Sequence, residues 1–430
     1  MNFEDLDKKY IWHPFTHLNY QRKNTLITKA RGVYLYTQDG RKIIDAIGSW
    51  WVNVHGHSHP YIVKQLKAQL DVMEHCVFSG FTHAPAIRLA AQLAEMVPIN
   101  HPKIFYSDNG STAVEVGIKM ALQYFYNKQQ AYKTKIIAFR NAYHGDTFGG
   151  MSVAARNVFN QAFRKNLFST YFIEVPNEKN FEQVKNQLIK YIQKKHIAAF
   201  IFEPLVQGAG GMRMYEALYL DELMRICKEN DVLCIADEVF TGFGKTGKLF
   251  ACAYLKNTPD ILCLSKGLTG GFLPLGVTVA SDPIYQVFVD TDKRKTFYHG
   301  HSFTANPLMC TAALANIHLI RRKEFFNKVE RIAEWHERFV QEVQQHKMVK
   351  AARCKGLIMA IEIKSKEKTH YLNTLSSVIE AYFIERSILL RPLGNVLYVV
   401  PPVCITKKEL HYIYSVIRDF LDELSTRIVS

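Results

Sequence analysis

The chain has 430 residues, 48% of them hydrophobic and 12% aromatic, so it can bury a large core shared among two or three domains. No apolar run approaches the roughly 18 residues of a membrane-spanning helix, and the charged, aromatic start lacks the apolar segment of a secretory signal peptide. The eight cysteines include no C-x-x-C pair, and several lie in apolar runs. We therefore expect a cytosolic protein with reduced thiols, without a disulfide framework or a zinc site.

The net charge of +15 is compatible with nucleic-acid binding, with an anionic substrate or with a simply basic surface. The basic residues form short clusters, such as Lys194-Lys195 and Lys407-Lys408, and no long basic tract. Zinc-finger spacings and RNA-binding aromatic signatures are both lacking. We favour a solvated basic surface, and we expect neither nucleic acid nor a membrane as a partner.

Residues 32–48 alternate between apolar and polar side chains around Asp39-Gly40, which predicts a β-hairpin. Short apolar runs then recur, and helical patterns such as residues 219–230 separate several of them. The runs are residues 135–139, 198–202, 232–236, 261–264 and 276–280. Alternation of apolar strands with helices predicts an α/β fold, in which helices cover both faces of a mostly parallel sheet.

After about residue 320 the pattern changes to helices separated by apolar runs at residues 356–363 and 396–400, which predicts a smaller α+β unit. We expect the N-terminal hairpin to pack with this unit. The predicted division is a large α/β domain of residues 51–319 and a discontinuous small domain of residues 1–50 and 320–430.

Polar residues directly follow three of the apolar runs: Glu203, the pair Asp237-Glu238, and Lys266. Because ligands bind outside the carboxyl ends of strands in open α/β sheets, these positions predict a polar site at one sheet edge. A lysine at the end of a buried strand either pairs with an acid, such as Asp237 or Glu203, or takes part in chemistry. The position alone leaves both alternatives open.

A candidate anion site lies upstream, where residues 106–125 predict a turn at Gly110 followed by a helix. The spacing of Thr112 and Glu115 predicts a capping box at the helix start. Free backbone N–H groups there, beside the Ser111 hydroxyl, can hold a phosphate. The alternative is an ordinary capped helix that binds nothing.

Together these parts match what pyridoxal phosphate requires. The amine of a lysine, here Lys266, bonds to the cofactor aldehyde. A carboxylate, here Asp237, keeps the pyridine nitrogen protonated, so that the ring can accept electrons. Burial beside a cationic ring would lower the lysine pKa from its ordinary value near 10.4 and expose the nucleophilic amine.

Three other motifs point to chemistry that we do not expect. Residues 242–249 nearly match a P-loop, but Leu249 replaces the magnesium-binding hydroxyl and the preceding strand ends too early, which argues against ATP binding. Residues 55–59 carry three alternating histidines without a nearby carboxylate, and residues 299–302 are similarly ambiguous. We therefore expect no metal.

The segments "CIADEVFTGFGKTGKLFA" and "DILCLSKGLTGGFLPLG", with the separation of Asp237 and Lys266, resemble class III aminotransferases of the fold-type I pyridoxal-phosphate superfamily. The resemblance covers nearly the entire chain. It implies a large domain with a mostly parallel central sheet, a smaller α+β domain and pyridoxal 5'-phosphate as cofactor. Segments such as "WHPFTH" (12–17) and "LLRPLGNVLYVVPP" (389–402) are similar to the biotin-pathway branch of the family.

That branch converts 8-amino-7-oxononanoate to 7,8-diaminononanoate. The tandem Trp50-Trp51 and the "RPLG" turn separate it from ornithine and 4-aminobutyrate relatives. The alternative is another ω-aminotransferase, acting on a diamine or an ω-amino acid.

The resemblance also implies roles for residues at the cofactor. Lys266 would carry the cofactor and move the proton between the substrate and cofactor carbons. Asp237 would pair with the pyridinium, while Gly110 and Ser111 would hold the phosphate. Glu203 would support the cofactor edge.

Other roles concern the substrate. Tyr143 would stack on the cofactor ring, act as a catalytic group and line the substrate site; otherwise it is a core tyrosine. Trp50 would line the channel for an alkyl chain, and Trp51 would either do the same or pack in the core. Arg391 would grip the substrate carboxylate, with a structural ion pair as the alternative.

The resemblance further implies a homodimer with a shared active site. Gly300, His301 and Ser302 would reach the partner's site, where Gly300 would contact substrate and Ser302 the cofactor phosphate. Phe15 stands where many members have tyrosine, and His301 stands where many have proline. Relatives with these motifs include lysine-using enzymes, so the amino donor is S-adenosylmethionine or lysine.

Overall fold

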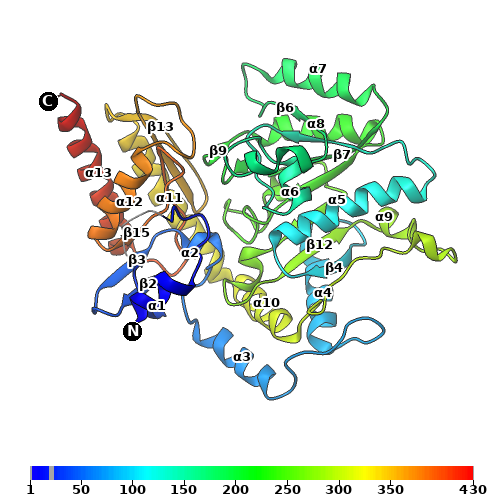
Figure 1. The fold of residues 1–430 in the computed structure, drawn as a ribbon, viewed down its shortest axis with the longest axis horizontal. Helices are drawn as coiled ribbons and strands as arrows, with labels where there is room; N and C mark the ends of the chain where they lie inside the picture. The colour runs from blue at the N-terminus through cyan, green and yellow to red at the C-terminus, as the bar shows by residue number, and fades with distance from the viewer. Residues whose placement is uncertain (1, 19–23, 430) are drawn as a thin grey trace.

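The computed structural model of the protein describes residues 2–18 and 24–429. A seven-stranded sheet forms its centre (Figure 1). In sheet order the strands are β4 (Lys103–Ser107), β12 (Gly276–Ala280), β11 (Ile261–Leu264), β10 (Leu233–Asp237), β7 (Ile197–Phe202), β5 (Lys135–Phe139) and β6 (Thr170–Ile173). Strand β12 runs antiparallel to both of its neighbours, whereas the other neighbouring pairs are parallel. The prediction of a mostly parallel sheet is confirmed.

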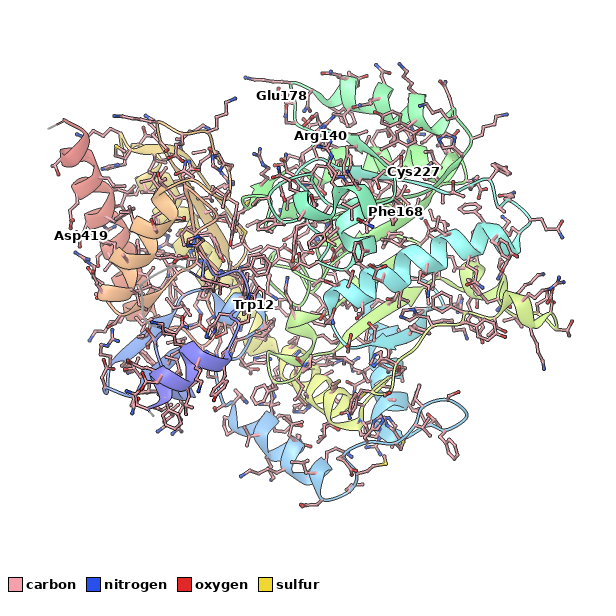
Figure 2. The ribbon with its side chains drawn as sticks, viewed as in Figure 1. Trp12, Arg140, Phe168, Glu178, Cys227 and Asp419 are labelled. Atoms are coloured by element: carbon pink, nitrogen blue, oxygen red, sulfur yellow. The ribbon has the colours of Figure 1, made fainter. Side chains whose placement is uncertain are left out.

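Helices cover both faces of this sheet. Successive strand residues point to opposite faces, and both sets are apolar and buried against helices. Ile235 of β10 packs in one core with helix α5 (Gly110–Asn127), whereas Cys234 and Ala236 pack in another core with α8 (Ala217–Glu229). Side chains fill the space between the ribbon layers (Figure 2). The other α-helices of residues 60–320 are α3 (Pro60–Leu70), α4 (Ala84–Met96), α6 (Phe148–Val153), α7 (Phe181–Ile192), α9 (Asp282–Gln286) and α10 (Pro307–Ile320).

The predicted N-terminal hairpin is present as β2 (Tyr34–Thr37) and β3 (Lys42–Asp45), which pair antiparallel; β1 (Ile27–Arg31) extends their sheet. Strand β15 (Ile388–Leu389) pairs parallel with β3, so the hairpin packs with the C-terminal part of the chain, as predicted. Helix α1 (Phe3–Tyr10) and the short α2 (Gly48–Trp51) flank these strands in the chain.

The C-terminal part contains a second antiparallel sheet and three long helices. The strands are β13 (Val349–Lys355), β14 (Ile358–Ile363) and β16 (Val396–Val399), and the helices are α11 (Lys323–Val343), α12 (Leu375–Glu385) and α13 (Lys407–Val429). Figure 1 shows both chain ends on this side of the molecule. The domain boundaries 51–319, 1–50 and 320–430 stay a prediction, and residues 1, 19–23 and 430 of those ranges lie outside the described residues.

The start of α5 differs from its prediction. Asn109, not Thr112, is the N-cap: its Oδ1 accepts a hydrogen bond from the Thr112 N–H at 3.0 Å, and the Thr112 hydroxyl accepts one from the Asn109 N–H at 3.1 Å. Glu115 is therefore not part of the capping box and instead accepts hydrogen bonds from the N–H groups of Gly149 and Gly150. The reason is that the helix begins one turn earlier, at a residue type that caps at least as well as threonine.

Within the described ranges, no helix is both long and apolar enough to cross a membrane. No group of three or more His, Cys, Asp or Glu side chains in these ranges could hold a metal ion. All eight cysteines are free thiols.

Candidate active site

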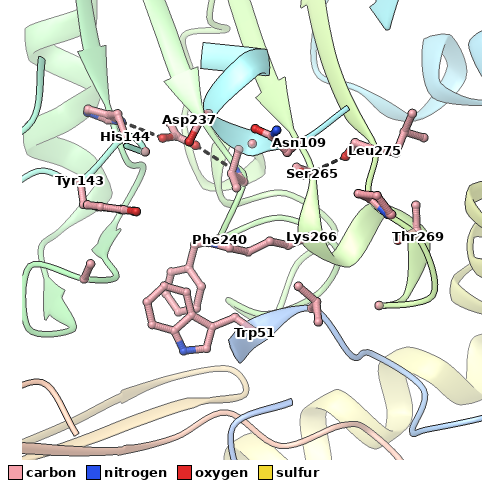
Figure 3. A pocket seen from close by; sticks show the side chains of 18 of the residues that line it. Trp51, Asn109, Tyr143, His144, Asp237, Phe240, Ser265, Lys266, Thr269 and Leu275 are labelled. Carbon is pink, nitrogen blue, oxygen red and sulfur yellow. Dashed lines mark hydrogen bonds and ion pairs between the residues drawn. The ribbon is translucent and has the colours of Figure 1, made fainter. Parts of the chain in front are cut away.

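A cavity of about 470 Å³ opens at the carboxyl ends of β10 and β11 (Figure 3). It brings together seven of the residues that the sequence singles out, from segments far apart in the chain. These are Trp51, Gly110, Ser111, Tyr143, Glu203, Asp237 and Lys266. Phe15, Trp50, Gly300, His301, Ser302 and Arg391 are not in its lining.

Asp237 is the last residue of β10 and is 4% exposed. Its Oδ2 lies 2.7 Å from His144 Nδ1, and its Oδ1 accepts a hydrogen bond from the Val239 N–H at 3.0 Å. Because an ionised carboxylate only accepts hydrogen bonds, His144 Nδ1 carries the proton. These two contacts fix a negative charge at the cavity wall, where it can pair with a cationic ring nitrogen.

Sequence reasoning missed His144. It directly follows Tyr143, but its contact with Asp237 spans 93 residues, so no spacing rule connects the two. His144 is buried, and its Nε2 has no hydrogen-bond partner. One signal in the sequence could have pointed to it: in the segment "AYHG", His144 is the neighbour of Tyr143, which was already a candidate site residue.

Glu203 and Tyr143 form one hydrogen-bonded unit in the cavity lining. Glu203 accepts hydrogen bonds from the backbone N–H groups of Tyr143 at 3.0 Å and Gly208 at 2.9 Å. Burial raises the pKa of Glu203 to about 7. The Tyr143 hydroxyl donates to Asp146 Oδ2 at 2.9 Å, and burial raises the pKa of this phenol, which stays neutral. Glu203 therefore holds the tyrosine loop in place.

Lys266 follows β11 in a strained conformation, with a φ of 45° that side-chain-bearing residues rarely adopt. In the described part of the chain, no ion pair joins it to Asp237 or Glu203. Its Nζ lies over the ring of Trp51, 4.6 Å from the centroid, and 5.9 Å from that of Phe240. Burial lowers the Lys266 pKa, and the charges of Asp237 and Glu203 oppose this shift. The amine is therefore positioned as a nucleophile, not as half of a salt bridge.

The N-terminus of α5 lies at the cavity and offers hydrogen-bond donors for an anion. The amides of Gly110 and Ser111 lie in its first turn, where N–H groups have no intrahelical partner. A Cβ on Gly110 would lie 2.6 Å from Val239 Cγ1, so only glycine lets the chain pass this close to the strand end. Unpaired amides, the positive end of the helix dipole and the Ser111 hydroxyl form a donor set that suits a phosphate.

The residues present therefore fit pyridoxal phosphate at its phosphate group, its ring nitrogen and its aldehyde carbon. Gly110 and Ser111 would hold the phosphate, Asp237 the ring nitrogen and Lys266 the aldehyde carbon. When bound, this cofactor supplies an electron sink for reactions at an amine-bearing carbon. A mostly parallel sheet that presents these three groups at its carboxyl edge places the protein among the pyridoxal-phosphate-dependent enzymes of fold type I.

Comparison with known proteins gives the family. Residues 17–421 match the family Aminotransferase class-III, and the chain belongs to this family of pyridoxal-phosphate-dependent aminotransferases. It is 45% identical over 423 residues to the adenosylmethionine-8-amino-7-oxononanoate aminotransferase of Synechococcus elongatus, with 96% of this chain and 99% of that protein covered. The protein of the same name from Staphylococcus aureus is 37% identical, with 94% of each chain covered.

Several solved structures are also similar to this chain over nearly its full length. The crystal structure of adenosylmethionine-8-amino-7-oxononanoate aminotransferase from Methanocaldococcus jannaschii is similar, with a TM-score of 0.92, 36% identity and 98% of both chains covered. An ω-transaminase from Pseudomonas jessenii in complex with PMP has a TM-score of 0.92 at 26% identity, with 99% of both chains covered. A PLP-bound amine transaminase from an uncultivated Pseudomonas species has a TM-score of 0.88 at 30% identity, covering 95% of this chain and 98% of that one.

Three predicted substrate residues form a second cluster beside the cavity. The rings of Phe15 and Trp50 meet edge to face at a centroid distance of 5.3 Å, and the Arg391 guanidinium lies 4.3 Å from the Trp50 centroid. Arg391 Nη2 donates to the Phe15 carbonyl at 3.3 Å. Phe159 links this cluster to the cavity, because its ring is 5.8 Å from Phe15 and 6.1 Å from Tyr143.

No ion pair joins Arg391 to a carboxylate within residues 2–18 and 24–429. The structural ion pair that was the alternative for this residue is therefore not formed there. Apart from the bond to the Phe15 carbonyl, its guanidinium could therefore donate to a carboxylate.

Gly300, His301 and Ser302 lie in the loop before α10. Gly300 and Ser302 are exposed, and His301 is partly buried. The His301 N–H donates to the Thr304 hydroxyl at 3.0 Å, which fixes the loop locally. Within one chain these residues do not reach the cavity lining.

Proposed function

We propose that the protein transfers an amino group to 8-amino-7-oxononanoate and so forms 7,8-diaminononanoate in biotin synthesis. The observation that carries this proposal is the full-length similarity to relatives named for that reaction, with 45% identity across 96% of the chain in one case. The cluster of Phe15, Trp50 and Arg391 supports it, because the acceptor is a long-chain keto acid with a terminal carboxylate.

In this proposal Lys266 binds the cofactor and moves the proton at the reacting carbon. Asp237, held by His144, keeps the ring nitrogen protonated. Gly110 and Ser111 hold the phosphate. Tyr143, fixed through Glu203, forms the wall against which cofactor and substrate lie, and it excludes water from the reacting face.

The acceptor would lie along the second cluster. Arg391 binds its carboxylate with two parallel hydrogen bonds, and Trp50 covers its alkyl chain. Trp51, buried in contact with Lys266 and Phe240, faces the reacting end. The distance between the carboxylate site and Lys266 then selects for chain length.

The amino donor would be S-adenosylmethionine or lysine. Phe15 stands where many members of the family have tyrosine and His301 stands where many have proline, and Phe15 lies in the substrate cluster. A phenylalanine cannot donate the hydrogen bond that a tyrosine would give there. We place the choice of donor at these two residues.

We also propose that the enzyme is a cytoplasmic homodimer whose active sites are shared. Eight free thiols support a reducing compartment. Exposed apolar side chains near the loop of residues 300–302 support the dimer: Tyr298 is 72% and Phe303 is 56% exposed. Ser302 would donate its hydroxyl to the partner's cofactor phosphate, His301 would form part of that cofactor site, and Gly300 would contact the partner's substrate.

The test is an amino-transfer assay with 8-amino-7-oxononanoate, after the pyridoxal phosphate form has been exposed to each donor separately. We expect 7,8-diaminononanoate with at least one donor. The second candidate is a general ω-aminotransferase, which the similarity to the Pseudomonas jessenii ω-transaminase favours. Inactivity on this ketone, together with activity on simple diamines, would select that candidate and refute the proposal.

A further inference from the structure

The turn that carries Lys266 is held by a side chain from a distant helix. Lys266 begins a short 3-10 turn, Lys266–Thr269, which ends at Gly270. The φ of Lys266 is 45° and that of Gly270 is 64°, so the turn both begins and ends in the left-handed region. Glycine adopts this region freely, but at Lys266 such a conformation persists only when the surrounding structure fixes it.

Asn316 of α10 provides this restraint. Its side-chain Nδ2 donates to the carbonyls of Gly267 at 2.8 Å and Leu268 at 2.9 Å, which are the first two peptides after Lys266. Asn316 is 0% exposed, so water cannot replace these hydrogen bonds. Both N–H groups of one amide are thereby used on the same turn.

The other hydrogen bonds of the turn join residues close in the sequence. The Leu268 N–H donates to the Ser265 carbonyl at 3.0 Å, the Gly270 N–H to the Gly267 carbonyl at 3.2 Å, and the Ser265 hydroxyl to the Leu275 carbonyl at 2.7 Å. The first two bonds close the turn on itself, and the third ties the residue before the turn to Leu275, which directly precedes β12. Asn316 connects the turn to α10, which packs against it.

The opposite side of the turn is also occupied. A Cβ on Gly267 would lie 2.9 Å from Lys245 Nζ, and one on Gly270 would lie 2.8 Å from Asn316 Oδ1. The turn therefore lies between the side chains of Asn316 and Lys245. Its glycines allow this close approach on both sides.

We propose that Asn316 is a positioning residue for Lys266: through the Gly267 and Leu268 carbonyls it holds the strained turn so that the Lys266 amine faces the cavity. This inference rests on the proposed role of Lys266 as the lysine that bonds to the cofactor. Asn316 is not among the residues that line the cavity, so it would touch neither cofactor nor substrate. Its loss should therefore reduce kcat and the rate of cofactor attachment and leave KM nearly unchanged.

The test compares Asn316→Ala and Asn316→Ser with a matched control, Asn127→Ala. Asn127 is 6% exposed, and its Nδ2 likewise donates to two backbone carbonyls, Val287 at 3.4 Å and Lys295 at 3.1 Å, outside the cavity lining. The first measurement is hydrogen–deuterium exchange of residues 264–271 in cofactor-free protein. The second is the rate at which added pyridoxal phosphate develops its lysine-bound absorbance. Steady-state kcat and KM are the third.

We expect Asn316→Ala to raise exchange in residues 264–271 and to slow attachment and kcat by about 10-fold to 100-fold, the range that a small misplacement of a reacting group costs. Serine, which keeps one donor, should lie between alanine and the wild type. Asn127→Ala should leave all three quantities within about twofold. If the alanine variant does not fold, the serine variant carries the comparison.

Unchanged exchange in residues 264–271, or equal losses in Asn316→Ala and Asn127→Ala, would overturn the inference. Failure of the proposed function would look different. In that case the wild type itself would attach no cofactor at Lys266, or would not aminate 8-amino-7-oxononanoate. The exchange measurement on cofactor-free protein depends on neither result.

Discussion

Lys245 is a buried amine without a hydrogen-bond partner, and replacing it with methionine should stabilise the protein. Its side chain is 3% exposed, and its Nζ has no hydrogen-bond partner. The nearby carboxylate, Glu238, is already engaged by three donors: the Thr241 hydroxyl and the backbone N–H groups of Ala251 and Cys252. Burial lowers the pKa of Lys245 to about 7, the charge of Lys266 adds to the shift, and Glu238 opposes it.

The magnitude follows from proton linkage. The Lys245 pKa is about 7 in the folded protein and 10.5 when unperturbed, so the unfolded state binds more protons between these two values. Stability therefore rises with pH across this window. The reason is that the unfolded protein carries a charged Lys245 at the lower pH values, and this proton must be lost, or the charge buried, on folding. With 1.36 kcal/mol per pKa unit, burial costs about 4 kcal/mol at pH 7, about 2 kcal/mol at pH 9 and below about 1 kcal/mol at pH 10.

Methionine has a similar length, no charge and no hydrogen-bonding requirement that burial would leave unmet. We expect Lys245→Met to gain about 4 kcal/mol at pH 7 and to lose most of that gain by pH 10. The assay is urea unfolding of the cofactor-free protein at several pH values, at one protein concentration, because subunit association would otherwise shift the result. The control is Lys248→Met in the same loop, where the lysine is exposed and a change within about 0.5 kcal/mol with no pH trend is expected.

Two outcomes would refute this reasoning. A Lys245→Met protein that is less stable than the wild type at pH 7 would mean that the amine makes a favourable interaction. A gain that stays constant from pH 7 to pH 10 would mean that packing, and not the charge, accounts for the effect.

The remaining predictions concern the site. Lys266→Ala should bind pyridoxal phosphate without the visible absorbance of the lysine-bound form, and survival of that band would assign the role to another amine. Arg391→Lys should raise KM for 8-amino-7-oxononanoate by about 10-fold to 100-fold with a smaller change in kcat, because a point charge cannot form two parallel hydrogen bonds; an unchanged KM would exclude carboxylate binding there. Gly110→Ala should weaken pyridoxal phosphate binding in an equilibrium titration, because its Cβ would collide with Val239 at 2.6 Å; equal affinity would place the phosphate elsewhere. Phe15→Tyr should change the ratio of half-reaction rates with S-adenosylmethionine and lysine, and an unchanged ratio would remove Phe15 as a donor determinant.

The parts of the site that could be predicted are those that short-range pattern and topology determine together. Glu203, Asp237 and Lys266 each follow an apolar run, and neighbouring parallel strands necessarily bring such residues to one edge. The helix after Gly110 was equally visible, although its cap was placed three residues late, because threonine and asparagine both cap well and the spacing fitted Thr112.

The parts that could not be predicted are contacts between segments that only the folded chain brings together. His144 meets Asp237 across 93 residues, and Asn316 meets Gly267 across 49. Neither residue belongs to a periodic pattern that the partner shares. The different positions of Trp50 and Trp51 are a further example: the sequence shows two adjacent tryptophans, but positive φ angles at both send Trp51 into the cavity wall and leave Trp50 with Phe15 and Arg391.

The Lys266 amine and the Asp237 carboxylate line the same cavity but do not pair, and this separation leaves both groups able to engage a cofactor. An ion pair between Lys266 and Asp237 would raise the lysine pKa and occupy the carboxylate, so that neither could engage a cofactor. Separate contacts of Asp237 and of Lys266 prevent this pairing. His144 and the Val239 N–H hold Asp237 at the end of β10, while the strained turn directs the Lys266 amine to the faces of Trp51 and Phe240. These aromatic faces contact the Lys266 amine without forming an ion pair with it, so the amine is held in place apart from the acid. The aromatic contacts of Lys266 and the His144–Asp237 hydrogen bond therefore give each of the two groups its own partner.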